Sequence, residues 1–291
     1  MRFRKFGHTN LDVSVIGQGT WNLETYDRSL AIQAFHRGME LGMTHIDTAY
    51  DYGNGAAEEF VGEALADRRQ QAFLVSKVLP AVADRNGTIA ACEGSLKRLK
   101  TDYLDCFLLH WWENNPLEET LEAFVALQES GKIRSFGLSN LSLDELKQAV
   151  QMVGPNRIAC HQVVYNIQSR DIEKEMLDWC EAQSIAVVGY APYGDVRAPS
   201  TLFAETLKIG GEVIENIAQR YQVSTRNVIL AFLLNHGVYV IPKGERPEFA
   251  EDNAKAADLI LTEGELEELN RVFPVPGDRP IPFTNDYYDA Q

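Results

Sequence analysis

The stretch THIDTAYDYGN (residues 44–54) runs from a short apolar strand directly into polar side chains. Residues 45–49 have the β-branched, alternating character of a buried strand. Asp47 stands near its end, and Tyr50 and Tyr52 follow in a segment that contains a glycine turn. A buried carboxylate is costly unless it is paired, so this stretch indicates a site at the end of a strand.

Strands of this kind recur along the chain and alternate with amphipathic stretches of helical period. The expected strands are 11–21, 45–49, 72–78, 103–110, 135–140, 160–166, 186–193 and 238–244. The expected helices are 29–42, 56–67, 88–100, 117–131, 142–153, 172–184, 212–222, 225–235 and 262–273. Strands alternating with helices predict βα units and a parallel sheet.

Eight such units without a linker predict an α/β protein, a (β/α)8 TIM barrel with extra helices near the C-terminus. We expect one domain over residues 1–291, with residues 275–291 as a C-terminal tail. An open, doubly wound sheet is the alternative. Its dinucleotide fingerprint requires three glycines, G-x-G-x-x-G. Gly17 and Gly19 begin that pattern, but Asn22 stands at the third position, so we favour the barrel.

Composition excludes several classes of partner. The formal net charge of −15 argues against nucleic acid and anionic membrane surfaces. The first residues lack the apolar core of a signal peptide, and no apolar run approaches the length of a membrane span. The four cysteines have no CxxC or zinc-finger spacing, which favours reduced thiols and a cytoplasmic location. The sequence gives no indication of oligomeric state.

In a barrel, active-site residues lie at the carboxyl ends of the strands and in the loops after them. Polar side chains occupy these ends in strand after strand: Asp47, Tyr52, Lys77, His110, Ser139, Asn140, Gln162, Tyr190 and Lys243. Four of them fit one reaction. Asp47 would keep Lys77 charged, and an ammonium about 4 Å from a phenol would lower its pKa by roughly three units, partly opposed by burial.

On this reading Tyr52 is a general acid, and His110 donates a hydrogen bond to the oxygen that receives the proton. The reaction then needs a hydride source rather than a Ser or Cys nucleophile. A metal-dependent barrel hydrolase is a rival, because His45 and Asp47 share one face of their strand. His110 and His161 lie on later strands. The positive charge of Lys77 would repel a metal cation bound beside it, so we expect no metal.

The stretches that carry these residues resemble the aldo-keto reductase family. They are GMTHIDTAYDYGNGAAEEFVGEAL (42–65), CEGSLKRLKTDYLDCFLLHWW (92–112), GKIRSFGLSN (131–140), HQVVYN (161–166) and VGYAPYG (188–194). The resemblance extends from residue 6 to residue 253. It implies a (β/α)8 barrel, an extended nicotinamide cofactor held without a Rossmann fold, and reduction of aldehydes or ketones to alcohols.

The resemblance also assigns roles by position. It makes Asp47, Tyr52, Lys77 and His110 a catalytic tetrad, with Tyr52 rather than Tyr50 as the acid. The expected cofactor contacts are Thr20, Trp21, Asp47, Ser139, Asn140, Gln162, Tyr190, Lys243, Arg246 and Asn253. Of these, Ser139, Asn140 and Gln162 would hold the carboxamide. Tyr190 would stack on the nicotinamide ring, and Asn253 would meet the adenine.

One segment departs from the family pattern. Gly244 follows Lys243 where Ser or Thr is usual, and Phe249 stands where an arginine is usual. Recognition of an adenosine 2′-phosphate would then fall to Lys243 and Arg246. We expect a moderate preference for NADPH, with NADH also possible.

The expected substrate contacts are Trp21, Tyr52, His110 and Trp111, and the partner is a small carbonyl compound with an apolar body. Trp112 could equally face the barrel exterior. The tail carries Phe283, Tyr287 and Tyr288, which would either fold over the barrel mouth or remain disordered. The alternative to an enzyme is a nicotinamide-binding, redox-sensing auxiliary subunit with little steady turnover.

Overall fold

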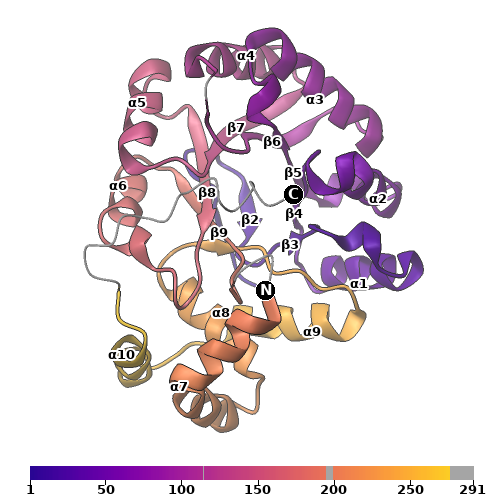
Figure 1. Cartoon of the computed structure of the whole chain (residues 1–291). Helices are drawn as coiled ribbons and strands as arrows, with labels where there is room; N and C mark the ends of the chain where they lie inside the picture. The colour runs from indigo at the N-terminus through magenta and orange to yellow at the C-terminus, as the bar shows by residue number, and fades with distance from the viewer. Residues whose placement is uncertain (114, 195–198, 276–291) are drawn as a thin grey trace.

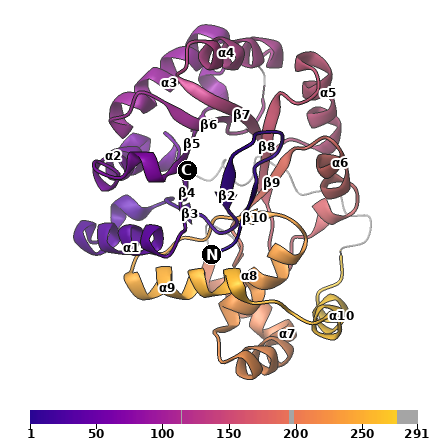
Figure 2. The same ribbon diagram turned by 180° about the vertical axis from the view of Figure 1, so that it is seen from behind.

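The computed structural model describes residues 1–113, 115–194 and 199–275 (Figure 1). The tail aromatics Phe283, Tyr287 and Tyr288 therefore lie outside the described residues. The chain forms a ring of strands surrounded by helices, seen from its two sides in Figures 1 and 2.

The ring is a parallel sheet whose strands follow chain order from β3 to β10. The strands are β3 (Gln18–Gly19), β4 (His45–Asp47), β5 (Phe73–Val78), β6 (Leu104–Leu109), β7 (Ile133–Ser139), β8 (Ile158–Val164), β9 (Ala186–Tyr190) and β10 (Tyr239–Val240). Ile16 bridges in parallel to Val240, and the Gly17 amide donates to the Val240 carbonyl at 2.8 Å. These contacts join the last strand to the first, so the predicted (β/α)8 barrel is confirmed.

Helices cover the outside of the ring. They are α1 (Arg28–Glu40), α2 (Ala56–Ala64), α3 (Arg85–Leu99), α4 (Leu117–Glu129), α5 (Leu143–Val153) and α6 (Met176–Ala182). The C-terminal region adds α7 (Pro199–Tyr221), α8 (Thr225–Asn235), α9 (Pro247–Lys255) and α10 (Glu263–Val272). Local sequence sets several of their starts; at α5, for example, Ser142 and Glu145 form a reciprocal capping box. The extra helices near the C-terminus are confirmed.

The strands β5 and β6 are buried at every position. One face of each packs inside the barrel and the other packs under helices, which explains why these runs are mostly apolar rather than alternating. Ser76, Lys77 and Asp105 are the buried polar exceptions. The few polar residues that end such strands are therefore held in dry, rigid surroundings.

The expected first strand, 11–21, is divided in the structure, and the prediction of one continuous barrel strand was wrong. Its first part is β2 (Asp12–Ser14), which pairs antiparallel with β1 (Phe3–Lys5); only β3 joins the barrel. The hairpin is held by Phe6, whose ring contacts His45, Phe73 and Tyr239.

Those three residues begin β4, β5 and β10, so the hairpin covers the amino-terminal end of the barrel. Three further elements differ from expectation. Helix α7 begins at Pro199, well before the expected start at residue 212. Helix α9 had no predicted counterpart, and the expected helix 172–184 begins as a 3-10 turn, Asp171–Glu173, before α6.

Candidate active site

Three buried side chains and the half-buried Tyr52 meet at the carboxyl ends of β4, β5 and β6. Asp47 ends β4, Lys77 lies near the end of β5, and His110 follows β6 directly. Lys77 Nζ donates to Asp47 Oδ1 at 2.6 Å and to the Tyr52 hydroxyl at 3.2 Å. The parallel pairing of neighbouring strands brings these residues together, as expected for residues at the carboxyl ends of barrel strands.

Tyr52 rather than Tyr50 reaches the lysine. Tyr52 begins a 3-10 helix, Tyr52–Gly55, in which Gly53, Asn54 and Gly55 all have positive φ. This left-handed turn, which glycine adopts without steric cost, lets the loop turn back so that the Tyr52 phenol enters the barrel. Tyr50 is 38% exposed, and its ring lies 4.7 Å from the Arg98 guanidinium.

The pKa of Tyr52 is raised well above its ordinary value of 10.0. Burial is the largest cause, and the carboxylates of Asp47 and Asp51 act in the same direction. The expected lowering by Lys77 was wrong in direction. The ammonium is already paired with Asp47, so it offsets less than the loss of water costs the phenolate. The phenol therefore stays protonated and releases its proton only to a strong base.

His110 is a neutral imidazole in this site. Burial lowers its pKa well below 6.5, and the charge of Lys77 acts the same way. Its ring meets that of Tyr52 edge to face at 5.9 Å and lies 4.9 Å from Trp111. A neutral hydrogen-bond donor and a protonated phenol thus border the same space.

Asp47 connects the tetrad to the later strands. Its second carboxylate oxygen accepts from Gln162 Nε2 at 2.7 Å, and its backbone carbonyl accepts from the Thr20 hydroxyl at 2.9 Å. The Gln162 amide nitrogen, which was expected to meet a cofactor carboxamide, therefore holds Asp47 in this structure. Thr20 likewise fixes the end of β4.

The end of β7 and the residue after it form a second polar group beside the tetrad. Asn140 adopts φ 64° and donates from Nδ2 to the His110 carbonyl at 3.0 Å. Its Oδ1 accepts from the Tyr190 hydroxyl, also at 3.0 Å. The buried Ser139 hydroxyl has no hydrogen-bond partner among the residues that the structure describes. A buried polar group without a partner is costly, so Ser139 fits a site completed by a polar ligand.

The end of β10 brings together the residues expected at the far end of a cofactor. Lys243 Nζ donates to the Tyr26 hydroxyl at 3.3 Å and lies 5.8 Å from the centre of the Trp21 ring. The buried Asn253 donates to the Lys243 carbonyl at 3.3 Å. Arg246, by contrast, is exposed, and its nearest carboxylate, Glu248, is 4.0 Å away.

The two tryptophans after β6 take different positions. Trp111 flanks His110, and its indole nitrogen donates to Glu113 Oε1 at 2.7 Å. Trp112 packs against the hydrophobic core and donates to the Asn115 carbonyl.

Sequence analysis missed Glu113 and also Asp51, whose pKa is raised by burial. Only the position of Asp51 beside Tyr52 could have suggested it.

Of the three histidines in the metal-hydrolase rival, His110 belongs to the tetrad, whereas the other two make separate contacts. His45 lies among the rings of Phe6, Phe73 and Tyr239, and His161 Nε2 accepts from the Leu141 amide at 3.2 Å. Within residues 1–113, 115–194 and 199–275, no group of three or more His, Cys, Asp or Glu side chains could hold a metal ion.

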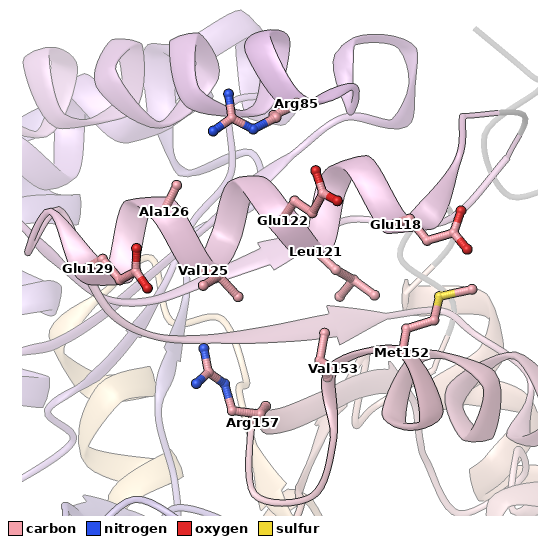
Figure 3. A pocket seen from close by; sticks show the side chains of 10 residues that line it. All are labelled: Arg85, Glu118, Leu121, Glu122, Val125, Ala126, Glu129, Met152, Val153 and Arg157. Atoms are coloured by element: carbon pink, nitrogen blue, oxygen red, sulfur yellow. The ribbon is translucent and has the colours of Figure 1, made fainter.

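A separate groove of about 590 Å³ lies on the outside of the barrel between α4 and α5 (Figure 3). Glu118 and Glu122 of α4 line it together with Met152 and Arg157. None of the tetrad residues lines this groove, so it is distinct from the site at the barrel rim.

Among the described helices, none combines the length and the apolar character that crossing a membrane requires.

Comparison with known proteins agrees with this geometry. The model of the Aldo/keto reductase family matches residues 15–273, and the chain therefore belongs to the aldo-keto reductase family. Methylglyoxal reductase YeaE of Escherichia coli (strain K12) is 40% identical over 271 residues, covering 91% of this chain and 93% of that protein. Glyoxal reductase of Bacillus subtilis (strain 168) is 29% identical over 280 residues, covering 93% and 95%.

A solved structure shows the same likeness in three dimensions. The crystal structure of an aldo/keto reductase from Klebsiella pneumoniae in complex with NADP and acetate superposes with a TM-score of 0.87. That protein is 38% identical, and the match covers 96% of this chain and 97% of the other.

Proposed function

We propose that the protein reduces aldehydes or ketones to alcohols with NADPH, and that Tyr52 is the proton donor. The observation that carries this proposal is the hydrogen-bonded series Asp47–Lys77–Tyr52, with distances of 2.6 and 3.2 Å, beside the neutral His110. It supplies a proton and a hydrogen bond to one point at the barrel rim. Family membership and the NADP-bound relative support the same activity.

The cofactor would lie along the rim from β7 to β10. Ser139 and Asn140 would hold the nicotinamide end, where the unpartnered Ser139 hydroxyl fits an amide ligand, and Tyr190 would border the ring. Lys243 and Asn253 would meet the adenosine end. When bound, NADPH supplies a hydride to the carbonyl carbon of the substrate.

The protein residues handle the proton and the developing charge. The substrate oxygen becomes an alkoxide-like base of roughly the strength of hydroxide, far more basic than a phenolate. A phenol with a raised pKa can still transfer its proton to such a base. Lys77 would then stabilise the resulting phenolate, and its ion pair with Asp47, at 2.6 Å, holds the ammonium in place.

His110 would hold the oxygen through a hydrogen bond from its neutral ring. Because its pKa is lowered, the His110 ring stays neutral and brings no second positive charge beside Lys77. The phenol is finally reprotonated from solvent. One hydride and one proton are consumed for each alcohol formed.

The substrate class that we propose is small 2-oxoaldehydes, of which methylglyoxal is the simplest test compound. Support comes from the methylglyoxal reductase and the glyoxal reductase that the chain resembles over more than nine-tenths of its length. Trp21 and Trp111 would form apolar walls, Trp111 being held beside His110 by Glu113. A small, partly apolar carbonyl compound suits such walls.

We further propose that residues 1–291 form one domain and that the protein works in the cytoplasm. The described residues 1–113, 115–194 and 199–275 build a single ring of strands around a common core. All four cysteines are buried free thiols, which suits a reducing compartment.

The decisive experiment follows the absorbance of NADPH in the presence of methylglyoxal, glyoxal, aromatic aldehydes, ketones and sugars. We expect steady turnover, fastest with a 2-oxoaldehyde and slower when NADH replaces NADPH. Tyr52→Phe is the matched control and should abolish it. A single slow turnover with cofactor retained on the protein would contradict the proposal and point to a redox-sensing subunit.

A further inference from the structure

Side chains from three separate segments meet beside the end of β10. Tyr193 follows β9, Arg226 lies in the first turn of α8, and Phe249 and Asn253 belong to α9. The guanidinium carbon of Arg226 is 5.2 Å from the centre of the Tyr193 ring and 5.5 Å from that of Phe249. The Tyr193 hydroxyl donates to Asn253 Oδ1 at 2.7 Å. Through these rings, a cation is held next to the expected adenosine end of the cofactor.

We propose that Arg226 determines the preference for the phosphorylated cofactor by placing its positive charge at the adenosine 2′-phosphate. This inference rests on the proposed function. It replaces Arg246 as the partner of Lys243 in that recognition. Phe249 stands where the family pattern has an arginine, and the guanidinium of Arg226 lies on the Phe249 ring. The positive charge of Arg226, on α8, therefore lies close to the α9 position at which the family pattern has an arginine.

The two arginines differ in how much their charge is worth. Arg246 is 59% exposed, and attraction between exposed charges is weakened by water and salt. Arg226 is half-buried between two aromatic rings. Charges interact more strongly where the local dielectric is low. A guanidinium already held on aromatic faces also loses less freedom when it binds.

Two of the three acidic residues of α9 have partners elsewhere, and the third, Glu248, is 62% exposed. Glu251 accepts from Arg37 of α1 at 2.8 Å, and Asp252 accepts from the Ser224 hydroxyl at the start of α8 at 2.7 Å. These carboxylates are therefore engaged by the protein itself. A carboxylate that accepts a hydrogen bond from the bare ribose hydroxyl of NADH would favour NADH over NADPH. The contacts of Glu251 and Asp252 within the protein reduce their capacity to do so.

Dissociation constants for NADPH and NADH in wild type and in Arg226→Gln would test the proposal, using quenching of tryptophan fluorescence. Loss of one charge-assisted hydrogen bond predicts that the NADPH preference falls about tenfold or more. NADH affinity should change by less than about twofold. Because the two constants are compared within one variant, a partly unfolded fraction cancels from their ratio.

Three further variants make the comparison specific. Arg226→Lys keeps the charge and should keep part of the preference. Lys5→Gln removes a charge from the hairpin at the opposite end of the barrel, where Lys5 pairs with Asp12, and should change neither affinity. Adding Phe249→Arg to Arg226→Gln should restore the preference, because a guanidinium returns to the same neighbourhood.

Several outcomes would overturn the inference. An unchanged preference in Arg226→Gln, or an equal loss of affinity for both cofactors, would show that Arg226 only supports the fold around the rings. Equal affinity of the wild type for NADPH and NADH would overturn the inference as well, because there would be no preference for Arg226 to determine. A wild-type protein that binds neither cofactor would instead refute the proposed function itself.

Discussion

Replacing Lys77 with methionine removes the charge that stabilises the phenolate of Tyr52 and leaves a side chain of similar length. The ammonium lies 3.2 Å from the phenol oxygen. At an effective dielectric constant of about 20, a full charge there would be stabilised by about 5 kcal/mol. If roughly half of that charge has formed in the transition state, the loss is about 2.6 kcal/mol, or nearly a hundredfold in rate.

The same substitution leaves the Asp47 carboxylate buried without its cation. Breaking a buried pair in this way costs about 3–5 kcal/mol of folding stability, so loss of activity could reflect unfolding. The double variant Lys77→Met/Asp47→Asn removes both charges and should recover most of the stability. Its rate should stay low, because the phenolate still has no ammonium beside it.

The assay is single-turnover reduction of methylglyoxal by bound NADPH, with cofactor affinity and urea unfolding measured on the same samples. We expect cofactor binding to persist in the double variant while the rate falls by about a hundredfold. A near-normal rate and pH profile in either variant would refute the role given to Lys77.

Tyr52→Phe should lower reduction by several orders of magnitude while NADPH still binds, and Tyr50→Phe should remain active; exchanged results would identify the other tyrosine as the acid. Burial lowers the pKa of His45 to about 4 and that of His161 to about 3, whereas both are near 6.5 in the unfolded chain. The unfolded state therefore binds more protons, so the free energy of unfolding should fall as pH drops from about 6.5 toward 4, by roughly 3 kcal/mol for His45 alone. Urea titrations across this range should show a weaker decline in His45→Leu, and an identical decline would refute the argument. Glu113→Ala should raise KM for methylglyoxal with little effect on kcat, because it frees the indole beside the tetrad, and Glu113→Gln should preserve the wild-type KM; a fall in kcat alone would contradict this role.

Sequence reasoning predicted which residues meet in space wherever they lie at the ends of regular strands. Asp47, Lys77 and His110 occupy equivalent places on neighbouring parallel strands, and such places converge at one rim whatever the details of packing. It failed for contacts between segments without that regularity. Arg226 looks in the sequence like any residue in the first turn of a helix, and its meeting with Tyr193 and Phe249 depends on how α8 and α9 pack.

The alternation of strand and helix periods by itself determined a parallel sheet of βα units, because buried parallel strands are mostly apolar and their helices are amphipathic. The missing third glycine, at Asn22, then favoured the barrel over an open sheet. Tertiary structure decided the rest. It divided residues 11–21 between a hairpin and the barrel, because Phe6 packs against the strand starts at the open amino-terminal end. It also reversed the expected direction of the Tyr52 pKa shift. The sequence shows that a lysine is near, but only the fold sets how deeply the phenol is buried and that Asp47 already holds the ammonium.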